Sequence, residues 1–135
     1  MKIAFLRHGP TEWNAAGRIQ GHTDLGLSAE GAAKMAALRL PETIAVSRVF
    51  VSPLSRARQT ARLLGLSGEI VDPRLMEQNW GNWEGLTRAE IKATHGDDVF
   101  VRAGLAEVFL PFGGESTGEL HARVAGFLRD VAAGE

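Results

Sequence analysis

The sequence contains no cysteine, and this absence excludes several kinds of chemistry at once. Without cysteine there is no disulfide framework, no thiolate zinc site and no thiol nucleophile. The scattered histidines and the pair Asp97-Asp98 also lack the spacing of metal ligands. We therefore predict that the protein needs neither a metal ion nor another cofactor.

Long apolar runs and a strong net charge are also missing. No apolar run approaches the length of a membrane span, and the N-terminus lacks a basic stretch followed by an apolar signal core. The formal net charge is −1, which gives no global attraction to nucleic acid or to an anionic membrane. We expect a cytoplasmic protein that has neither nucleic acid nor a membrane as a partner.

What the chain does contain is typical of a globular protein. Hydrophobic residues make up 44% of its 135 residues, and charged residues make up 23%. This length supports one hydrophobic core but not two. Because no repeat, low-complexity tract or polar linker interrupts the chain, we predict a single domain over residues 1–135.

Three short apolar segments predict buried strands, at residues 2–6, 48–51 and 69–71. Helical patterns lie between and after them. Ser28 is the expected N-cap of a helix over residues 29–40, with Pro41 as its stop. Short strands that alternate with amphipathic helices favour a parallel sheet covered by helices. We predict an α/β fold, a three-layer αβα sandwich with a mostly parallel sheet.

Other helix signals complete this prediction. Ser52 and Pro53 suit the N-cap and first position of a helix that ends at Gly65. Capping-box patterns open further helices at Thr87, with Gly96 as the stop, and at Ser116.

Charged side chains follow the first two predicted strands. Arg7 and His8 come directly after the first strand, and Arg56 lies in the first turn of the helix after the second. Ligands of parallel sheets bind just beyond the carboxyl ends of the strands. A helix N-terminus there offers free amide donors, and arginine can hold phosphate oxygens with two hydrogen bonds. The sequence therefore predicts an anion pocket.

A histidine in such a pocket can form a covalent intermediate. Imidazole titrates near ~6.5, so an unprotonated nitrogen of His8 is available at neutral pH to attack phosphorus. The other ring nitrogen must then be held by an acceptor such as a backbone carbonyl. The leaving group needs a proton, and Glu77, among aromatic residues after the third strand, is the best candidate donor.

Four ordered segments resemble the motifs of the histidine phosphatase superfamily, which is phosphoglycerate-mutase-like. They are LRHGPTEWN at residues 6–14, SPLSRARQTA at residues 52–61, EQNWGNWEG at residues 77–85 and GGES at residues 113–116. Together they span almost the whole chain.

The resemblance implies roles for particular residues. His8 is the implied nucleophile and Glu77 the implied proton donor, with Arg7 and Arg56 as phosphate ligands. Asn14 is a further phosphate ligand, and Thr11, Gln20 and Gly21 are candidate substrate-binding residues. Pro10 replaces the glutamate that is frequent in the family, and we assign no functional effect to it.

Family members carry a second catalytic histidine on a later strand, in a motif resembling His-Gly-Gly. Of the other histidines, we expect His22 in a loop, His95 at a helix end and His121 inside the last helix, so none fits this role. We expect the sequence to be a fragment of a longer protein. A short chain that really ends at Glu135 would leave strand edges open, and a homo-oligomer formed through them stays an alternative.

The leading hypothesis is hydrolysis of a small phosphomonoester. Mutases of the family carry a long insertion after the acidic motif, whereas only residues 78–112 separate Glu77 from Gly113. This spacing favours a phosphatase over a mutase. The alternatives are a non-catalytic phosphate-binding module, a truncated inactive family member and a phosphoglycerate-type mutase.

Single residues keep alternatives of their own. Arg56 could be a solvated helix residue, and Glu77 could be the ion-pair partner of an arginine. The apolar segment from Val99 to Leu110 could be a lid over the substrate or ordinary packing.

Overall fold

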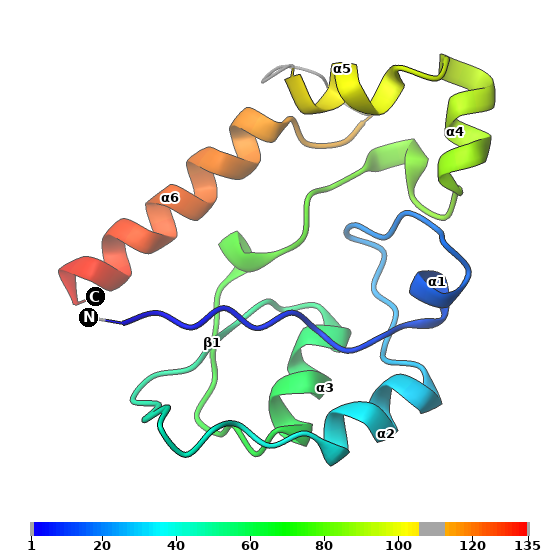
Figure 1. Cartoon of the computed structure of the whole chain (residues 1–135). Coiled ribbons are helices and arrows are strands. Elements are labelled where there is room, and N and C mark those ends of the chain that lie inside the picture. The colour runs from blue at the N-terminus through cyan, green and yellow to red at the C-terminus, as the bar shows by residue number, and fades with distance from the viewer. Residues whose placement is uncertain (1, 106–112, 135) are drawn as a thin grey trace. The chain divides into compact units, whose positions relative to one another are not determined.

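The computed structural model describes residues 2–105 and 113–134 (Figure 1). Contacts group the chain into two compact units, which are described separately. Unit 1 comprises Met1–Glu12 and Asp24–Met76, and unit 2 comprises Trp13–Thr23 and Glu77–Glu135. A single domain over residues 1–135 stays a prediction.

Helices alternate with short strands along the described residues. The elements in chain order are α1 (Glu12–Ala15), α2 (Ala29–Ala37), β1 (Phe50–Val51), α3 (Ser55–Leu63), β2 (Ile70–Val71), the 3-10 turns η1 (Pro73–Leu75) and η2 (Gly81–Trp83), α4 (Arg88–His95), α5 (Val99–Leu105) and α6 (Thr117–Ala133). β1 and β2 pair in parallel, with Phe50 opposite Ile70 and Val51 opposite Val71. The fold is of the α/β class, as predicted.

In unit 1, α3 packs against both α2 and β1. Met35 of α2, Val51 of β1 and Leu54 and Ala61 at α3 are buried between these elements. Ser28 caps α2 as expected, because its hydroxyl accepts the amide hydrogen of Gly31 at 3.0 Å. This arrangement places the start of α3 beside the end of β1, where the anion pocket was predicted.

The predicted strand over residues 2–6 is wrong. These residues are all described and form no strand, and the side chains of Phe5 and Leu6 are 73% and 55% exposed. A strand needs a hydrogen-bonded neighbour, and within the described residues the sheet consists of β1 and β2 alone. The apolar pattern is that of a strand, but no pairing partner in the described residues completes it.

Two predicted helix boundaries also need correction. α2 ends at Ala37 rather than at residue 40, because Leu38 already adopts an extended conformation. α3 begins at Ser55 rather than at Pro53, and Leu54 precedes it as the N-cap without a side-chain hydrogen bond. The Ser52 hydroxyl instead accepts from the Leu54 amide at 3.3 Å, which forms a local turn before the helix.

In unit 2, residues of η2, α4 and α5 form a small hydrophobic core. Trp83, Ile91 and Val99 are buried, and Trp80 and Phe100 pack against them. The apolar segment from Val99 was expected to be either a lid over the substrate or ordinary packing, and Val99 itself is packed in this core. Residues 106–112 lie outside the described residues. Both predicted capping boxes are confirmed, at Thr87 for α4 and at Ser116 for α6.

A short antiparallel contact sets the loop that follows α1 in unit 2. Arg18 forms a bridge with Thr87, and the amide of Ile19 donates to the carbonyl of Leu86 at 2.8 Å. The amide of Gly85 donates back to the carbonyl of Ile19 at 2.9 Å. Gln20 and Gly21 follow directly, so their place in the unit is set by this contact.

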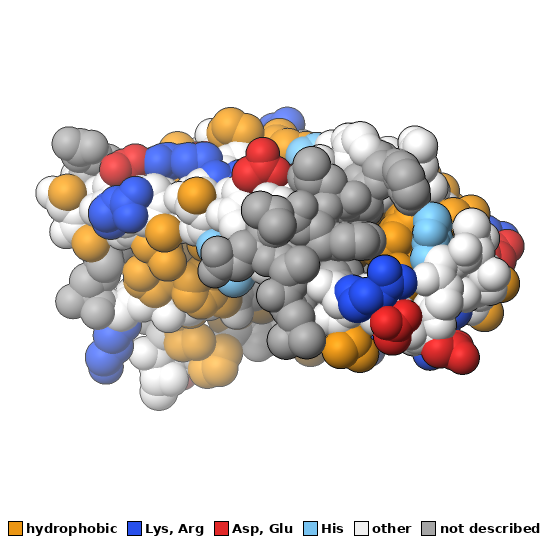
Figure 2. All heavy atoms as spheres, turned by 90° about the horizontal axis from the view of Figure 1, so that it is seen from above, with side chains coloured by type: hydrophobic (Ala, Val, Ile, Leu, Met, Phe, Trp, Pro, Cys, Tyr) orange, Lys and Arg blue, Asp and Glu red, His pale blue; other side chains and the backbone are white. Residues whose placement is uncertain are grey.

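No helix among the described residues has both the length and the apolarity to cross a membrane. The face in Figure 2 carries acidic and basic side chains close to one another, in keeping with the net charge of −1.

Candidate active site

In unit 1, His8 is half-buried and held by its neighbour. Its Nδ1 lies 2.7 Å from the carbonyl oxygen of Gly9. A carbonyl can only accept a hydrogen bond, so Nδ1 carries the hydrogen in this contact. In neutral imidazole the lone pair is then on Nε2. A backbone carbonyl thus holds one ring nitrogen of His8, as expected for a nucleophilic histidine.

Thr60, which was not among the predicted site residues, connects this loop to α3. Its Oγ1 accepts the amide hydrogen of Gly9 at 2.9 Å and donates to the carbonyl of Arg56 at 2.8 Å. Gly9 also lies against α2, since a Cβ at this position would stand 2.5 Å from Cγ of Met35. The loop is thus fixed without being part of a sheet. The signal for Thr60 was its place four residues after Arg56 on one helix face.

Arg56 is 1% exposed, so the alternative of a solvated helix arginine is wrong. An arginine is seldom buried without partners, because removing its charge from water is costly. Thr11 is also fully buried in this unit, whereas the Arg7 side chain is exposed. Unit 1 therefore holds four predicted site residues, and the Thr60 hydroxyl connects Gly9, the residue after His8, with the backbone of Arg56.

The N-terminus of α3 differs from the prediction of free amide donors. The carboxylate of Asp24 accepts from the amide of Ser55 at 2.7 Å and from its hydroxyl at 2.8 Å. A side chain distant in sequence thus already places an anion at this helix end, which suits the helix dipole. The sequence offered no local signal for this cap, because Asp24 lies 31 residues before Ser55.

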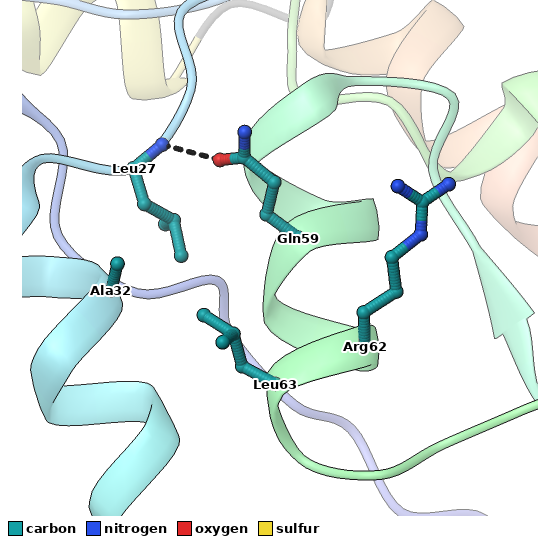
Figure 3. Close-up of a pocket in the computed structure, with 5 residues that line it drawn as sticks. All are labelled: Leu27, Ala32, Gln59, Arg62 and Leu63. Atoms are coloured by element: carbon teal, nitrogen blue, oxygen red, sulfur yellow. Dashed lines mark hydrogen bonds between the residues drawn. The ribbon is translucent and has the colours of Figure 1, made fainter.

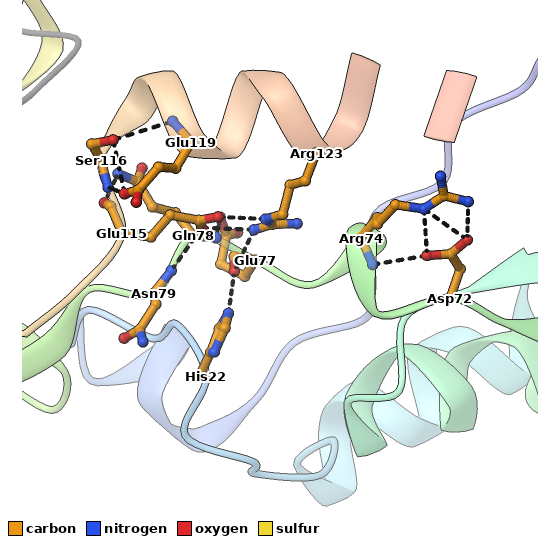
Figure 4. Close-up of polar contacts among 10 residues, drawn as sticks. All are labelled: His22, Asp72, Arg74, Glu77, Gln78, Asn79, Glu115, Ser116, Glu119 and Arg123. Carbon is orange, nitrogen blue, oxygen red and sulfur yellow. Dashed lines mark hydrogen bonds and ion pairs between the residues drawn. The ribbon is translucent and has the colours of Figure 1, made fainter. Parts of the chain in front are cut away.

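In unit 2, Glu77 has an exposed side chain and a firmly bound backbone. Its Oε1 accepts from the amide of Gln78 at 2.8 Å. Its carbonyl oxygen lies 2.9 Å from Nε2 of His22 and 3.1 Å from Nη2 of Arg123 (Figure 4). Arg123 contacts the backbone carbonyl oxygen of Glu77 and not its carboxylate. The alternative that Glu77 is the ion-pair partner of an arginine therefore finds no support in this contact.

Glu84 organises the loop that contains Gln20 and Gly21. Its carboxylate accepts hydrogen bonds from the amides of His22, Thr23 and Trp80 and from the Thr23 hydroxyl. Burial alone would raise the pKa of Glu84, but these hydrogen bonds hold the pKa below its ordinary value. A Cβ on Gly21 would meet this carboxylate and stand 2.5 Å from the carbonyl oxygen of Gln78. Glu84 lies in the motif at residues 77–85, but it was not among the predicted site residues.

A second carboxylate binds the segment after Glu77. Glu115 forms an ion pair with Arg123, with Nε–Oε1 and Nη2–Oε2 distances of 2.5 and 2.8 Å (Figure 4). The Arg123 hydrogen bond lowers the pKa of Glu115 despite the opposing effect of burial. The side chains of Arg123 and Glu115 are largely buried, at 19% and 15% exposed.

The predicted site residues thus divide between the two units. Arg7, His8, Thr11 and Arg56 belong to unit 1, and Asn14, Gln20, Gly21 and Glu77 belong to unit 2. Asn14 lies in α1 with an exposed side chain. His22, His95 and His121 lie in a loop, at the end of α4 and inside α6, which confirms their predicted positions.

Unit 1 also has a surface hollow of about 300 Å³ between α2 and α3 (Figure 3). Its lining residues are Leu27, Ala32, Gln59, Arg62 and Leu63. The amide of Leu27 donates to the Gln59 side chain at 2.7 Å across it. None of the predicted site residues lines this hollow. Within the described ranges, no three His, Asp or Glu side chains are grouped in a way that could hold a metal ion.

The sequence pattern of the histidine phosphatase superfamily (branch 1) matches residues 3–135. The chain belongs to this superfamily. It is similar to the glucosyl-3-phosphoglycerate phosphatase of Mycobacterium tuberculosis, with 36% identity over 99% of this chain and 61% of that protein. It is also similar to phosphoglycerate mutase-like protein 4 of Arabidopsis thaliana, with 32% identity over 96% of this chain and 60% of that protein.

Solved structures show the same likeness. A mycobacterial glucosyl-3-phosphoglycerate phosphatase in complex with VO3 gives a TM-score of 0.76 at 32% identity, over 95% of this chain and 65% of that one. A phosphoglycerate mutase from Thermus thermophilus gives a TM-score of 0.73 at 37% identity, over 91% of this chain and 68% of that one. These neighbours confirm a phosphoglycerate-mutase-like fold. The chain spans about three fifths of the length of the two curated relatives, from Mycobacterium tuberculosis and Arabidopsis thaliana.

Proposed function

We propose that the chain hydrolyses the phosphomonoester of a small metabolite through a phosphohistidine at His8. The observation that carries the proposal is the 2.7 Å contact between Nδ1 of His8 and the Gly9 carbonyl, which leaves Nε2 as the nucleophilic nitrogen. Membership of the superfamily supports the same chemistry. The buried Arg56 and the exposed Arg7 supply positive charge for the phosphoryl oxygens.

The proposed reaction has two steps. In the first, the lone pair on Nε2 of His8 forms a P–N bond while the ester P–O bond breaks, and the leaving oxygen takes the proton of the Glu77 carboxyl. In the second, a water oxygen attacks phosphorus, the P–N bond breaks and Glu77 recovers a proton from that water. The products are the alcohol and inorganic phosphate, with His8 and Glu77 restored.

The names of relatives indicate which substrates to test first. One similar protein is named a phosphatase of glucosyl-3-phosphoglycerate and others are named phosphoglycerate mutases. Esters of the 3-phosphoglycerate type are therefore the first candidates for this chain. Residues 78–112 are too few for the long insertion of the mutases, which supports net phosphate release over transfer.

Phosphate release from these esters, followed beside a His8→Ala variant, tests the proposal. We expect turnover by the unaltered chain and a loss of at least ~10³-fold in the variant, because a catalytic nucleophile has no substitute. His121→Ala, an exposed histidine of α6, is the matched control and should keep full activity. Vanadate should inhibit competitively.

Other outcomes separate the alternatives. Turnover that survives His8→Ala contradicts the covalent mechanism. Binding of phosphate esters without turnover indicates a phosphate-binding module or an inactive family member. Transfer of the phosphoryl group between two positions, without net release, indicates a mutase.

A further inference from the structure

The carbonyl oxygen of Glu77 receives two side-chain hydrogen bonds from distant parts of the sequence. His22 lies 55 residues before Glu77 and reaches this oxygen through Nε2 at 2.9 Å. Arg123 lies 46 residues after it, on α6, and reaches the same oxygen through Nη2 at 3.1 Å (Figure 4). Because the acceptor is a carbonyl, Nε2 of His22 carries the hydrogen. One backbone atom is thus fixed from two sides.

The rest of the segment is bound to the same structure. The amide of Asn79 donates to the Glu115 carboxylate at 3.3 Å, and the amide of Glu115 donates to the carbonyl of Asn79 at 2.8 Å. The side-chain amide of Gln78 donates to the carbonyl of Glu115 at 2.9 Å. Arg123 is itself held by Glu115, so its guanidinium bridges this carboxylate and the carbonyl of Glu77. Residues 77, 78 and 79 are therefore each anchored.

The anchoring matters most for Glu77, because packing does not fix its side chain. The side chain is exposed, and its carboxylate accepts a hydrogen bond from the amide of the next residue, Gln78. The direction of the carboxyl therefore follows the backbone at residues 77 and 78. A catalytic group displaced by about 1 Å can lose ~10²-fold in rate.

We infer that Arg123 and His22 are positioning residues that aim the Glu77 carboxyl at the leaving group. This inference rests on the proposed function and deepens it, since it assigns roles to two residues outside the predicted site. Neither side chain needs to touch the substrate. Arg123 has the larger share, because its charged fork is held by an ion pair on one side and donates to Glu77 on the other.

The test compares two substrates that differ in their need for a proton. Glycerol phosphate has an alkoxide leaving group, which must be protonated as it departs. Dinitrophenyl phosphate has a leaving group stable enough to depart unprotonated. A misdirected Glu77 should slow the first reaction and spare the second.

We expect Arg123→Ala to lower kcat for glycerol phosphate by ~10- to 100-fold, and for dinitrophenyl phosphate by less than about 3-fold. KM should change little, because substrate contacts are unaltered. Arg123→Lys should restore part of the loss. His22→Ala should follow the same pattern with a smaller fall, and His22→Gln, which keeps a donor, should restore it. Arg129→Ala and His121→Ala, exposed on the same helix α6, should leave both reactions unchanged.

Each result has one meaning. An equal fall on both esters would show a merely structural role and overturn the inference while the proposed function stands. No turnover by the unaltered chain of these two esters or of esters of the 3-phosphoglycerate type would overturn the proposed function, and the positioning role with it. If Arg123→Ala does not fold, as judged by circular dichroism, the His22→Ala and His22→Gln pair decides the question by the same comparison.

Discussion

The segment that carries His8 and the segment that carries Glu77 are held in place by different kinds of contact. In unit 1, the loop at Gly9 is anchored by the neutral hydroxyl of Thr60 and by close packing against Met35. In unit 2, the segment at residues 77–79 and the neighbouring loop at residues 20–23 are anchored by the carboxylates of Glu115 and Glu84. Neutral contacts respond little to pH, whereas carboxylates lose their acceptor strength when protonated.

This difference suits the two chemical roles in the proposed reaction. A nucleophile needs one fixed ring tautomer, which a single carbonyl contact provides. A proton donor must be aimed at a leaving oxygen, and its exposed side chain depends on the backbone for that direction. Substitutions that alter one set of contacts at a time can therefore separate the two kinds of anchoring.

The largest effect is expected for Gly21→Ala in unit 2. The new Cβ would stand 2.5 Å from the Gln78 carbonyl oxygen, a backbone atom that cannot move aside cheaply. We expect a loss of about 3 kcal/mol in the free energy of unfolding. Gly17→Ala is the control, because its Cβ would meet no atom within 4 Å and only its φ of +65° opposes the change. It should cost about 1 kcal/mol. Denaturant unfolding measures both, and equal losses would contradict this account.

Thr60→Val tests the neutral anchor of unit 1. The substitution keeps the shape of the side chain but leaves the amide of Gly9 without its acceptor in a buried place. We expect a loss of about 2 kcal/mol and a fall in turnover, both independent of pH between neutrality and mild acid. Thr94→Val removes a similar hydroxyl contact, to the carbonyl of Glu90 at 3.2 Å, from an exposed face of α4. That control should stay within about 0.5 kcal/mol of the unaltered chain.

Glu84→Gln tests the carboxylate anchor of unit 2 through pH. Hydrogen bonds hold the folded pKa of Glu84 below its ordinary value of 4.5, so its stabilisation is fully present above that value. The stabilisation is lost as pH falls through the folded pKa. The variant should therefore be less stable than the unaltered chain at neutral pH, by about 1.5 kcal/mol, and the gap should close in acid. Unfolding curves at several pH values check this, and a gap independent of pH would refute the role assigned to the charge.

The smallest effect is expected for Asp24→Ala. This change removes the acceptor of the Ser55 amide and hydroxyl at the N-terminus of α3. A lost helix cap costs about 1 kcal/mol. Asp97→Ala removes a carboxylate that is 99% exposed and forms a long ion pair with Lys92, with an Nζ–Oδ1 distance of 3.9 Å. Such an exposed pair contributes little, so this variant should show almost no change in thermal unfolding. If the two variants melt alike, Asp24 does not act as a cap.

Local patterns predicted much of this structure because their physical cause is local. The capping boxes at Thr87 and Ser116 need only residues three apart, and both form as predicted. The apolar segment at residues 2–6 failed for the opposite reason, since a strand depends on a hydrogen-bonded neighbour that no local pattern reveals.

The same distinction holds for the candidate site. His8 and Glu77 could be singled out by residue type and motif. Asp24 and Arg123 could not, because each acts through a contact with a segment that is remote in sequence. The sequence alone left open whether Arg56 is solvated or buried, because spacing does not reveal which helix face is covered. The structure shows that Arg56 is buried.

The central claim is that His8 carries the phosphoryl group during turnover. Rapid acid-free quenching with substrate present, followed by peptide mass spectrometry, tests it most directly. We expect the added mass of one phosphoryl group on the peptide that contains His8, and we expect that label to be lost in His8→Ala. Turnover without a label on His8, or with the label on another residue, would contradict it.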